Sequence, residues 1–238
     1  MQNLFCKLFH SSARDSSGVM KVGHDGGVRF RAVTMAGLVA ELAERIVGMP
    51  GWCRVGIDGP PAAAPGVWSA ELAEVLRARG RAVLAVRSDD FWRPRSVRFE
   101  QGRTNPDAFY EEWLDLAGLR REVLDPLAPG GSGRVLPTLW NPATDRATRA
   151  SYLDLAPGGV LLLSGALLLG AGLPLDFAVH LEMSPAALAR RTPSDEAWTL
   201  PAFARYADEV DPASFADVVV RVDDPKHPAV LISRLADT

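Results

Sequence analysis

Residues 58–66 are a loop rich in glycine and proline between a predicted strand and a predicted helix. A loop in this position can bind phosphate. In α/β proteins the amides of such a loop and the helix N-terminus converge on one anion. The usual pattern is a glycine, four residues, then Gly-Lys-Ser/Thr. Counted from Gly59, the last three positions hold Ala64, Pro65 and Gly66. By spacing alone the signal is weak, because Gly-Pro-Pro often forms an ordinary turn.

A second chemical group, Asp89, follows the next predicted strand, residues 82–86. The carboxyl ends of parallel strands are where such sheets bind ligands, so Asp89 is expected near the loop. The alternative is that Asp89 and Asp90 are loop or capping residues. The arginines of the following segment suit a solvated loop and an anion-binding surface equally well: Arg93, Arg95, Arg98 and Arg103.

Strands and helices alternate along the chain, which predicts an α/β fold with a mostly parallel sheet covered on both faces. Thr34 is expected to cap the first helix, and Ser184 a later one. Residues 1–30 show no sustained period and are predicted to form a flexible tail, with 31–238 as one domain. The strands are expected at 53–57, 82–86, 134–140, 160–163, 177–182 and 218–222, and the helices at 34–48, 67–80, 106–124, 185–191 and 200–210.

Composition excludes several classes of function. The net charge of −3 gives no reason to expect a nucleic-acid surface. No apolar run approaches the ~18 residues of a membrane span, and no signal peptide is evident. Two dissimilar cysteines, Cys6 and Cys53, indicate a reducing, cytoplasmic setting. None of the four histidines has a partner at metal-ligand spacing, so no metal site is predicted.

Beyond these patterns, the segment RVGIDGPPAAAPGVWSAELAEVLRARGRAVLAVRSDDFWRP resembles the opening of bacterial uridine kinase-like proteins. The resemblance continues through Asn105 to Phe109, LRREVLDPLAPGG, Thr144-Asp145 and ADVVV, and spans roughly residues 52–226. It implies a P-loop NTPase-type parallel sheet flanked by helices on both faces. It also implies MgATP as cofactor, a nucleoside-like small-molecule substrate, and phosphoryl transfer to a 5′-hydroxyl or a similar alcohol.

The same resemblance implies a role for individual residues. Asp89 matches the family's catalytic aspartate, which accepts the proton of the attacking hydroxyl. The remaining matches are the nucleotide-binding loop (Gly59, Ala62, Ala63, Ala64, Pro65, Gly66), the substrate contacts (Trp92, Arg93, Phe109, Trp140, Asp145) and the lid (Arg190, Arg191).

The residues expected to bind the phosphates and Mg²⁺ depart from the family pattern. Pro65 stands where lysine is expected, and the lysines of the chain are Lys7, Lys21 and Lys226 alone. Gly66 lacks the hydroxyl that holds Mg²⁺, and Ser164 stands where an acidic residue is expected. Losing the lysine contacts costs ~3–6 kcal/mol in charge-assisted hydrogen bonds, or ~10²–10⁴ in rate. The lid segment is also shortened.

Three hypotheses follow. The first is a kinase homologue with a degraded ATP site, which acts by binding a small molecule. The second is an active phosphotransferase in which Arg87, Arg190 or Arg191 replaces the missing lysine, because guanidinium binds phosphate well. The third is a partner-binding protein without catalysis, in which the tail and the short lid are contact surfaces.

Overall fold

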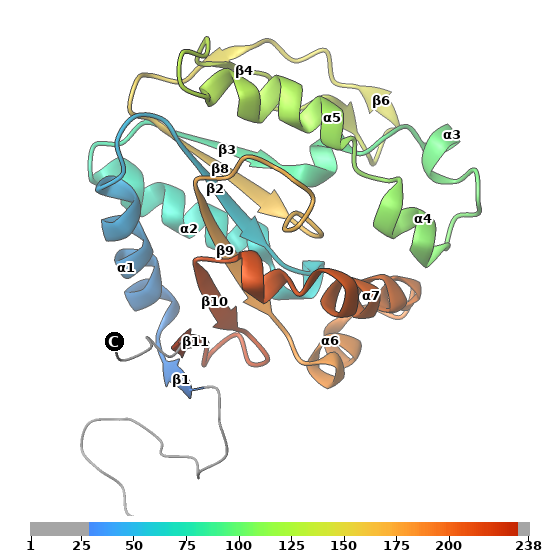
Figure 1. Cartoon of the computed structure of the whole chain (residues 1–238). Coiled ribbons are helices and arrows are strands. Elements are labelled where there is room, and N and C mark those ends of the chain that lie inside the picture. Colours follow the sequence, from blue (N-terminus) through green and yellow to red (C-terminus); the bar gives the residue numbers. More distant parts are fainter. Residues whose placement is uncertain (1–28, 233–238) are drawn as a thin grey trace, which may run out of the picture.

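A computed structural model of the chain describes residues 29–232. Seven strands form one sheet in the order β1-β11-β10-β9-β2-β8-β3 (Figure 1). Five neighbouring strands, β10, β9, β2, β8 and β3, run parallel to one another. Strand β11 runs antiparallel to both β10 and β1. The strands are β1 Arg29–Ala32, β2 Cys53–Asp58, β3 Val83–Arg87, β8 Val160–Gly165, β9 Phe177–Glu182, β10 Val218–Arg221 and β11 Ala229–Ile232.

Helices cover both faces of this sheet, as predicted (Figure 1). The helices α1 and α2 bury an apolar stripe against β2, β9 and β10. On the other face, Leu119, Val123 and Leu124 pack on Leu161 and Leu163 of β8. The α-helices are α1 Met35–Val47, α2 Pro65–Ala78, α3 Arg95–Arg98, α4 Pro106–Glu111, α5 Leu116–Leu119, α6 Pro185–Arg191 and α7 Leu200–Val210.

The predicted continuous helix over 106–124 is wrong, because the chain breaks between α4 and α5. The Asp115 side chain accepts a hydrogen bond from the Gly118 amide and caps α5, while its own amide donates to the Phe91 carbonyl at 2.9 Å. The Trp113 carbonyl accepts from the Arg93 amide at 2.8 Å. These tertiary bonds favour a break in an apolar pattern that would otherwise suit one helix.

Two further differences concern strands. The predicted strand 134–140 is two short ones, β4 Arg134–Val135 and β5 Trp140–Asn141, which pair with β7 Leu153–Asp154 and β6 Arg146–Ala147 in separate two-stranded sheets. The sheet also gains the unpredicted strands β1 and β11. The predicted tail lies outside the described residues, except Arg29 and Phe30, which belong to β1.

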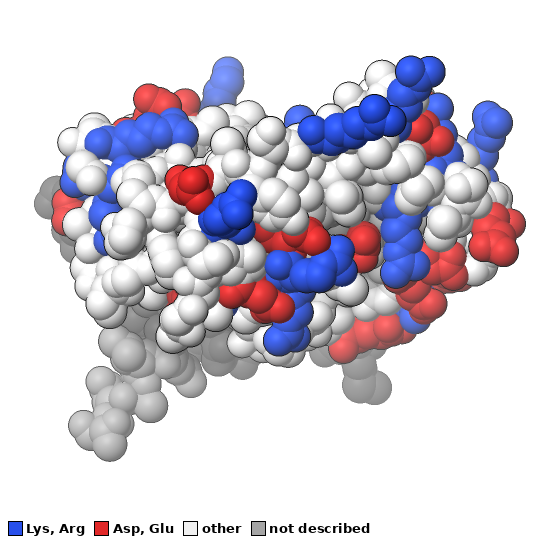
Figure 2. Space-filling model, turned by 90° about the horizontal axis from the view of Figure 1, so that it is seen from above, with Lys and Arg blue, Asp and Glu red and all other residues white. Residues whose placement is uncertain are grey.

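The surface of the described part carries both signs of charge. Figure 2 shows basic and acidic side chains interspersed over the face seen from above. Within residues 29–232, no helix is both long and apolar enough to cross a membrane. Cys53 is a buried free thiol, and burial raises its pKa to about 11.

Candidate functional site

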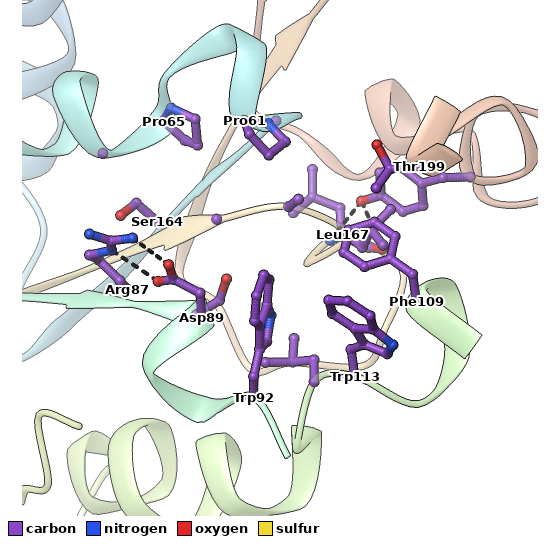
Figure 3. Close-up of a pocket in the computed structure, with 18 of the residues that line it drawn as sticks. Pro61, Pro65, Arg87, Asp89, Trp92, Phe109, Trp113, Ser164, Leu167 and Thr199 are labelled. Atoms are coloured by element: carbon purple, nitrogen blue, oxygen red, sulfur yellow. Dashed lines mark hydrogen bonds and ion pairs between the residues drawn. The ribbon is translucent and has the colours of Figure 1, made fainter. Parts of the chain in front are cut away.

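A cavity of about 1160 Å³ opens at the carboxyl ends of β2, β3 and β8 (Figure 3). Pro61 and Pro65 lie on one side of it, and Asp89 and Trp92 face them across the space. Seven of the predicted site residues line this cavity: Gly59, Ala64, Pro65, Gly66, Asp89, Trp92 and Phe109. Seven others do not: Ala62, Ala63, Arg93, Trp140, Asp145, Arg190 and Arg191.

The loop before α2 is folded onto itself. Residues Pro61–Ala63 form a single 3₁₀ turn, in which the Ala63 amide donates to the Pro60 carbonyl and the Ala64 amide to the Pro61 carbonyl, at 2.8 and 2.9 Å. Three prolines at positions 60, 61 and 65 have no amide hydrogen. Within residues 60–66, only the amides of Ala62 and Gly66 lack a carbonyl acceptor. A phosphate would therefore meet far fewer donors than a phosphate-binding loop supplies.

Two positions show how tightly this loop is held. Gly59 has no room for a side chain, since a Cβ there would lie 2.8 Å from the Leu181 Cβ. Ala64 adopts a left-handed conformation, φ 55° and ψ 53°, at the N-cap of α2. A side chain in this conformation costs about 1–2 kcal/mol.

Replacing Ala64 with glycine is therefore expected to raise the free energy of unfolding by about 1 kcal/mol. Glycine removes the left-handed penalty and is a better N-cap than alanine, although it loses about 0.4–1 kcal/mol to the entropy of the unfolded chain. Urea denaturation measures the difference. The matched control Ala70→Gly, at an exposed interior position of α2, should instead lose about 1 kcal/mol. A destabilised Ala64→Gly variant would contradict the prediction.

Asp89 is already paired. Its two carboxylate oxygens accept hydrogen bonds from the Arg87 guanidinium, one of them from Nε at 2.9 Å. Such a bidentate pair is among the stronger polar interactions of proteins. A substrate hydroxyl that donates to this carboxylate would compete with Arg87, which is the one basic residue among the described residues that line the cavity.

Asp90 is different, because its half-buried carboxylate has no hydrogen-bond or ion-pair partner within residues 29–232. Burial, and next the neighbouring Asp89, raise its pKa above the usual range. From the sequence, Asp89 is the expected catalytic residue and Asp90 is considered only as a loop or capping residue. The charge of Asp90 thus carries a burial cost that the nearby Arg87 offsets only in part.

Replacing Asp90 with asparagine is expected to stabilise the fold at neutral pH. Because the pKa of Asp90 is raised in the folded state, the unmodified protein loses stability as pH rises from the unfolded pKa through the folded one. The advantage of Asp90→Asn should therefore be full at neutral pH and vanish below about pH 3, where the carboxyl is protonated in both states. Thermal unfolding at the two pH values measures it, with the exposed Asp208→Asn as control. An advantage that grows at acid pH would refute this.

Three polar side chains form a buried network that the sequence analysis missed. Asp58, fully buried at the end of β2, accepts hydrogen bonds from the Leu168 amide at 2.9 Å and from Tyr206 at 3.3 Å, and contacts His180 Nδ1 at 2.8 Å. Burial, and next the Asp58 charge, raise the pKa of Tyr206, so its hydroxyl stays a donor. The available signal was a polar residue in each of two apolar strands, since Asp58 pairs with His180 across β2 and β9.

Aromatic rings make one wall of the cavity. Trp113 packs edge-on against Trp92 and Phe109, with ring centroids 5.2 Å apart in both pairs, and Trp198 lies 5.4 Å from Trp113. Trp113 and Trp198 pack together, and both also line the cavity.

The other predicted residues make structural contacts outside the cavity. Trp140 donates to the Asp145 carboxylate at 3.0 Å, and the same oxygen accepts from the Arg95 amide at 2.9 Å. These two bonds, the backbone one first, lower the pKa of Asp145. Arg191 donates to the Val222 carbonyl, and Arg190 is exposed at the end of α6. The segment between α6 and α7 instead contributes Glu196, Trp198 and Thr199 to the cavity lining.

The lining does not fit MgATP. A nucleoside triphosphate needs free cations, but the cavity offers one guanidinium, already paired, and four carboxylates, those of Asp89, Asp90, Glu111 and Glu196. Gly66, where the resemblance implies a magnesium-binding hydroxyl, has none, and Ser164 stands where the resemblance implies a carboxylate. Within residues 29–232 there is also no group of three or more His, Cys, Asp or Glu side chains that could hold a metal ion.

Comparisons with known proteins match this chain at the level of the fold. The sequence matches no protein-family model and no curated protein sequence. Among solved structures, it is similar to a possible uridine kinase from Bacillus stearothermophilus, with a TM-score of 0.62 and 21% identity over 76% of this chain and 96% of that one. For a candidate fructose transport system kinase from Silicibacter sp. TM1040, the TM-score is 0.53 and the identity 24%, over 77% of this chain and 92% of that one. For the YGR205w protein, the TM-score is 0.56 and the identity 11%, over 84% of this chain and 100% of that one.

These three likenesses establish the fold. The α/β, P-loop NTPase-type sheet expected from the sequence is confirmed, and so is the resemblance to uridine kinase-like P-loop kinases at the level of fold. The identities are too low to carry over a substrate or an activity.

Proposed function

We propose that this chain is a uridine kinase-like protein whose ATP site is degraded, with weak or absent kinase activity and a retained small-molecule cavity. The observation that carries the proposal is the sequence Ala64-Pro65-Gly66 at the start of α2, preceded by a loop whose amides bond to its own carbonyls. The paired state of Arg87 supports it, because no free cation in the described lining can replace the missing ammonium group.

Calorimetric titration of the full chain with MgATP tests this proposal. Loss of the lysine contacts, ~3–6 kcal/mol, places the expected dissociation constant in the millimolar range or weaker. Micromolar affinity would refute a degraded site.

A second candidate is an active kinase for a nucleoside or another small alcohol, in which arginine replaces lysine. It is favoured by the place of Arg87, which lies beside Asp89 and Ser164 across the cavity from Pro65 (Figure 3). Transfer of radiolabelled phosphate from ATP to a panel of nucleosides and small alcohols decides between the two. Transfer that is lost in both Arg87→Ala and Asp89→Asn would support the second candidate, and no transfer to any acceptor would count against it.

A further inference from the structure

The charges that face the cavity are unbalanced once their partners are counted. Asp89 is neutralised by Arg87, and Glu111 by Arg205 of α7 at 2.7 Å. Asp90 and Glu196 remain, and neither has an ion-pair partner in the part of the chain that the structure describes. The cavity is therefore negative, which repels phosphate and favours a positively charged group.

Asp90 is the better placed of these two carboxylates. Glu196 is exposed, so water screens its charge, whereas Asp90 is half-buried in the turn Ser88–Phe91 and lines the cavity. A half-buried charge without a partner is costly to keep. A cation bound in the cavity would offset that cost.

The aromatic wall suits the apolar body of a ligand more than its charge. The guanidinium of Arg98, which is 3% exposed and does not line the cavity, already lies 4.7 and 5.2 Å from the ring centroids of Trp113 and Trp92. Two of the ring systems therefore already have a cation stacked on them. The wall can offer apolar contact, which leaves recognition of a positive charge to Asp90.

A separate observation indicates that the cavity is built for a ligand with a hydrogen-bonding group. Ser69 lies on α2 one turn after Pro65, lines the cavity and is 3% exposed. Its hydroxyl has no hydrogen-bond partner within residues 29–232. A buried unpaired hydroxyl costs about 1–3 kcal/mol, which a polar atom of a bound molecule would recover.

We propose that the cavity binds a phosphate-free organic amine, an apolar or aromatic body with a protonated nitrogen that pairs with Asp90. This inference rests on the proposed function in one respect, namely that the cavity still binds a small molecule. The two differ in the charge of the ligand, because a kinase-like fold would suggest an anionic phosphate compound and the inference names a cation. The aromatic wall receives the body, and Asp90 receives the ammonium group.

A matched pair of probes tests the inference on the full chain at neutral pH. Phenethylamine and 3-phenylpropionate share a phenyl ring on a two-carbon chain and differ in the sign of the charged group. Tryptophan fluorescence follows binding, since Trp92, Trp113 and Trp198 line the cavity. The amine is expected to bind at least about tenfold more tightly than the acid, equivalent to ~1.4 kcal/mol.

Asp90→Asn should reduce this preference to less than about threefold, whereas the exposed Asp208→Asn should leave it unchanged. Unfolding curves confirm that both variants are folded. Equal or preferential binding of the acid, a preference unchanged in Asp90→Asn, or no saturable binding of the amine would overturn the inference. The MgATP titration is independent: micromolar MgATP affinity together with amine selectivity would refute the degraded ATP site and leave this inference standing.

Discussion

Replacing Asp58 with alanine is expected to lower the free energy of unfolding by about 3–5 kcal/mol, the usual cost of removing one member of a buried charged network. Asp58 is fully buried and joins three separate segments: the Leu168 amide, the His180 ring and the Tyr206 hydroxyl. Without the carboxylate, the amide and the ring are left without this partner, at about 1–3 kcal/mol each. Tyr206 keeps two bonds, one donated to the Leu169 carbonyl at 3.1 Å and one accepted from the Leu169 amide at 2.9 Å.

The same substitution should loosen the floor of the cavity. Leu167, which lines it, has a left-handed backbone with φ 62°, an unfavourable conformation for a bulky residue. Asp58 and Tyr206 hold the amides of the two residues that follow, Leu168 and Leu169. Removing Asp58 releases part of what maintains that strain.

Urea denaturation of Asp58→Ala and Asp58→Asn measures the effect. Asparagine keeps the volume and an acceptor for the Leu168 amide, so its cost should be smaller, about 1–3 kcal/mol. The exposed Asp208→Ala serves as control and should change stability by less than about 0.5 kcal/mol. A cost below about 1 kcal/mol for Asp58→Ala would show that the network does not stabilise the fold.

The elements that the sequence predicted best are those with local signals. Thr34 and Ser184 cap their helices through side-chain bonds to residues three further along the chain, as expected, and α6 and α7 begin and end at the predicted residues. Apolar runs likewise identified the central strands. Such signals lie within a few residues of the element they define, so one sequence suffices to read them.

What the sequence did not predict depends on distant partners. The break at Asp115 requires the Phe91 carbonyl, and strand β1 requires β11, about 200 residues away in the chain. In the candidate site, too, some features could be predicted from local sequence and others depend on distant contacts. The loop at Ala64 and the carboxylate of Asp89 were predicted to lie together, and both line the cavity. The pairing of Asp89 with Arg87 and the isolation of Asp90 depend on side-chain geometry, which no spacing in the sequence encodes.

Restoring the phosphate-binding residues is expected to produce the largest functional change. A variant with Ala64→Gly, Pro65→Lys and Gly66→Thr should bind MgATP about 100-fold more tightly than the unmodified protein, near the low end of the ~3–6 kcal/mol assigned to the lysine contacts. The lysine restores an ammonium group and an amide donor, and the threonine restores a hydroxyl for Mg²⁺. Space allows it, because a Cβ at position 66 meets no atom within 4 Å.

The gain in MgATP affinity is expected at the low end of this range because other departures from the phosphate-binding pattern remain. Pro60 and Pro61 still lack amide hydrogens, and Ser164 still replaces the expected carboxylate. Phosphoryl transfer should recover less than binding does, since the Asp89 oxygens remain paired with Arg87. In this variant we therefore expect a larger gain in MgATP affinity than in the rate of phosphoryl transfer.

Calorimetry with MgATP measures the gain, and a control variant isolates its cause. Ala64→Gly, Pro65→Ala and Gly66→Ala together restore the amide donor without the ammonium group or the hydroxyl, and should improve affinity by about tenfold, the low end for one amide hydrogen bond to a charged group. If the lysine variant bound MgATP no better than this control, the missing ammonium group would not be what disables the site. The barrier would then lie in features that both variants keep, such as Pro60, Pro61, Ser164 and the acidic lining of the cavity.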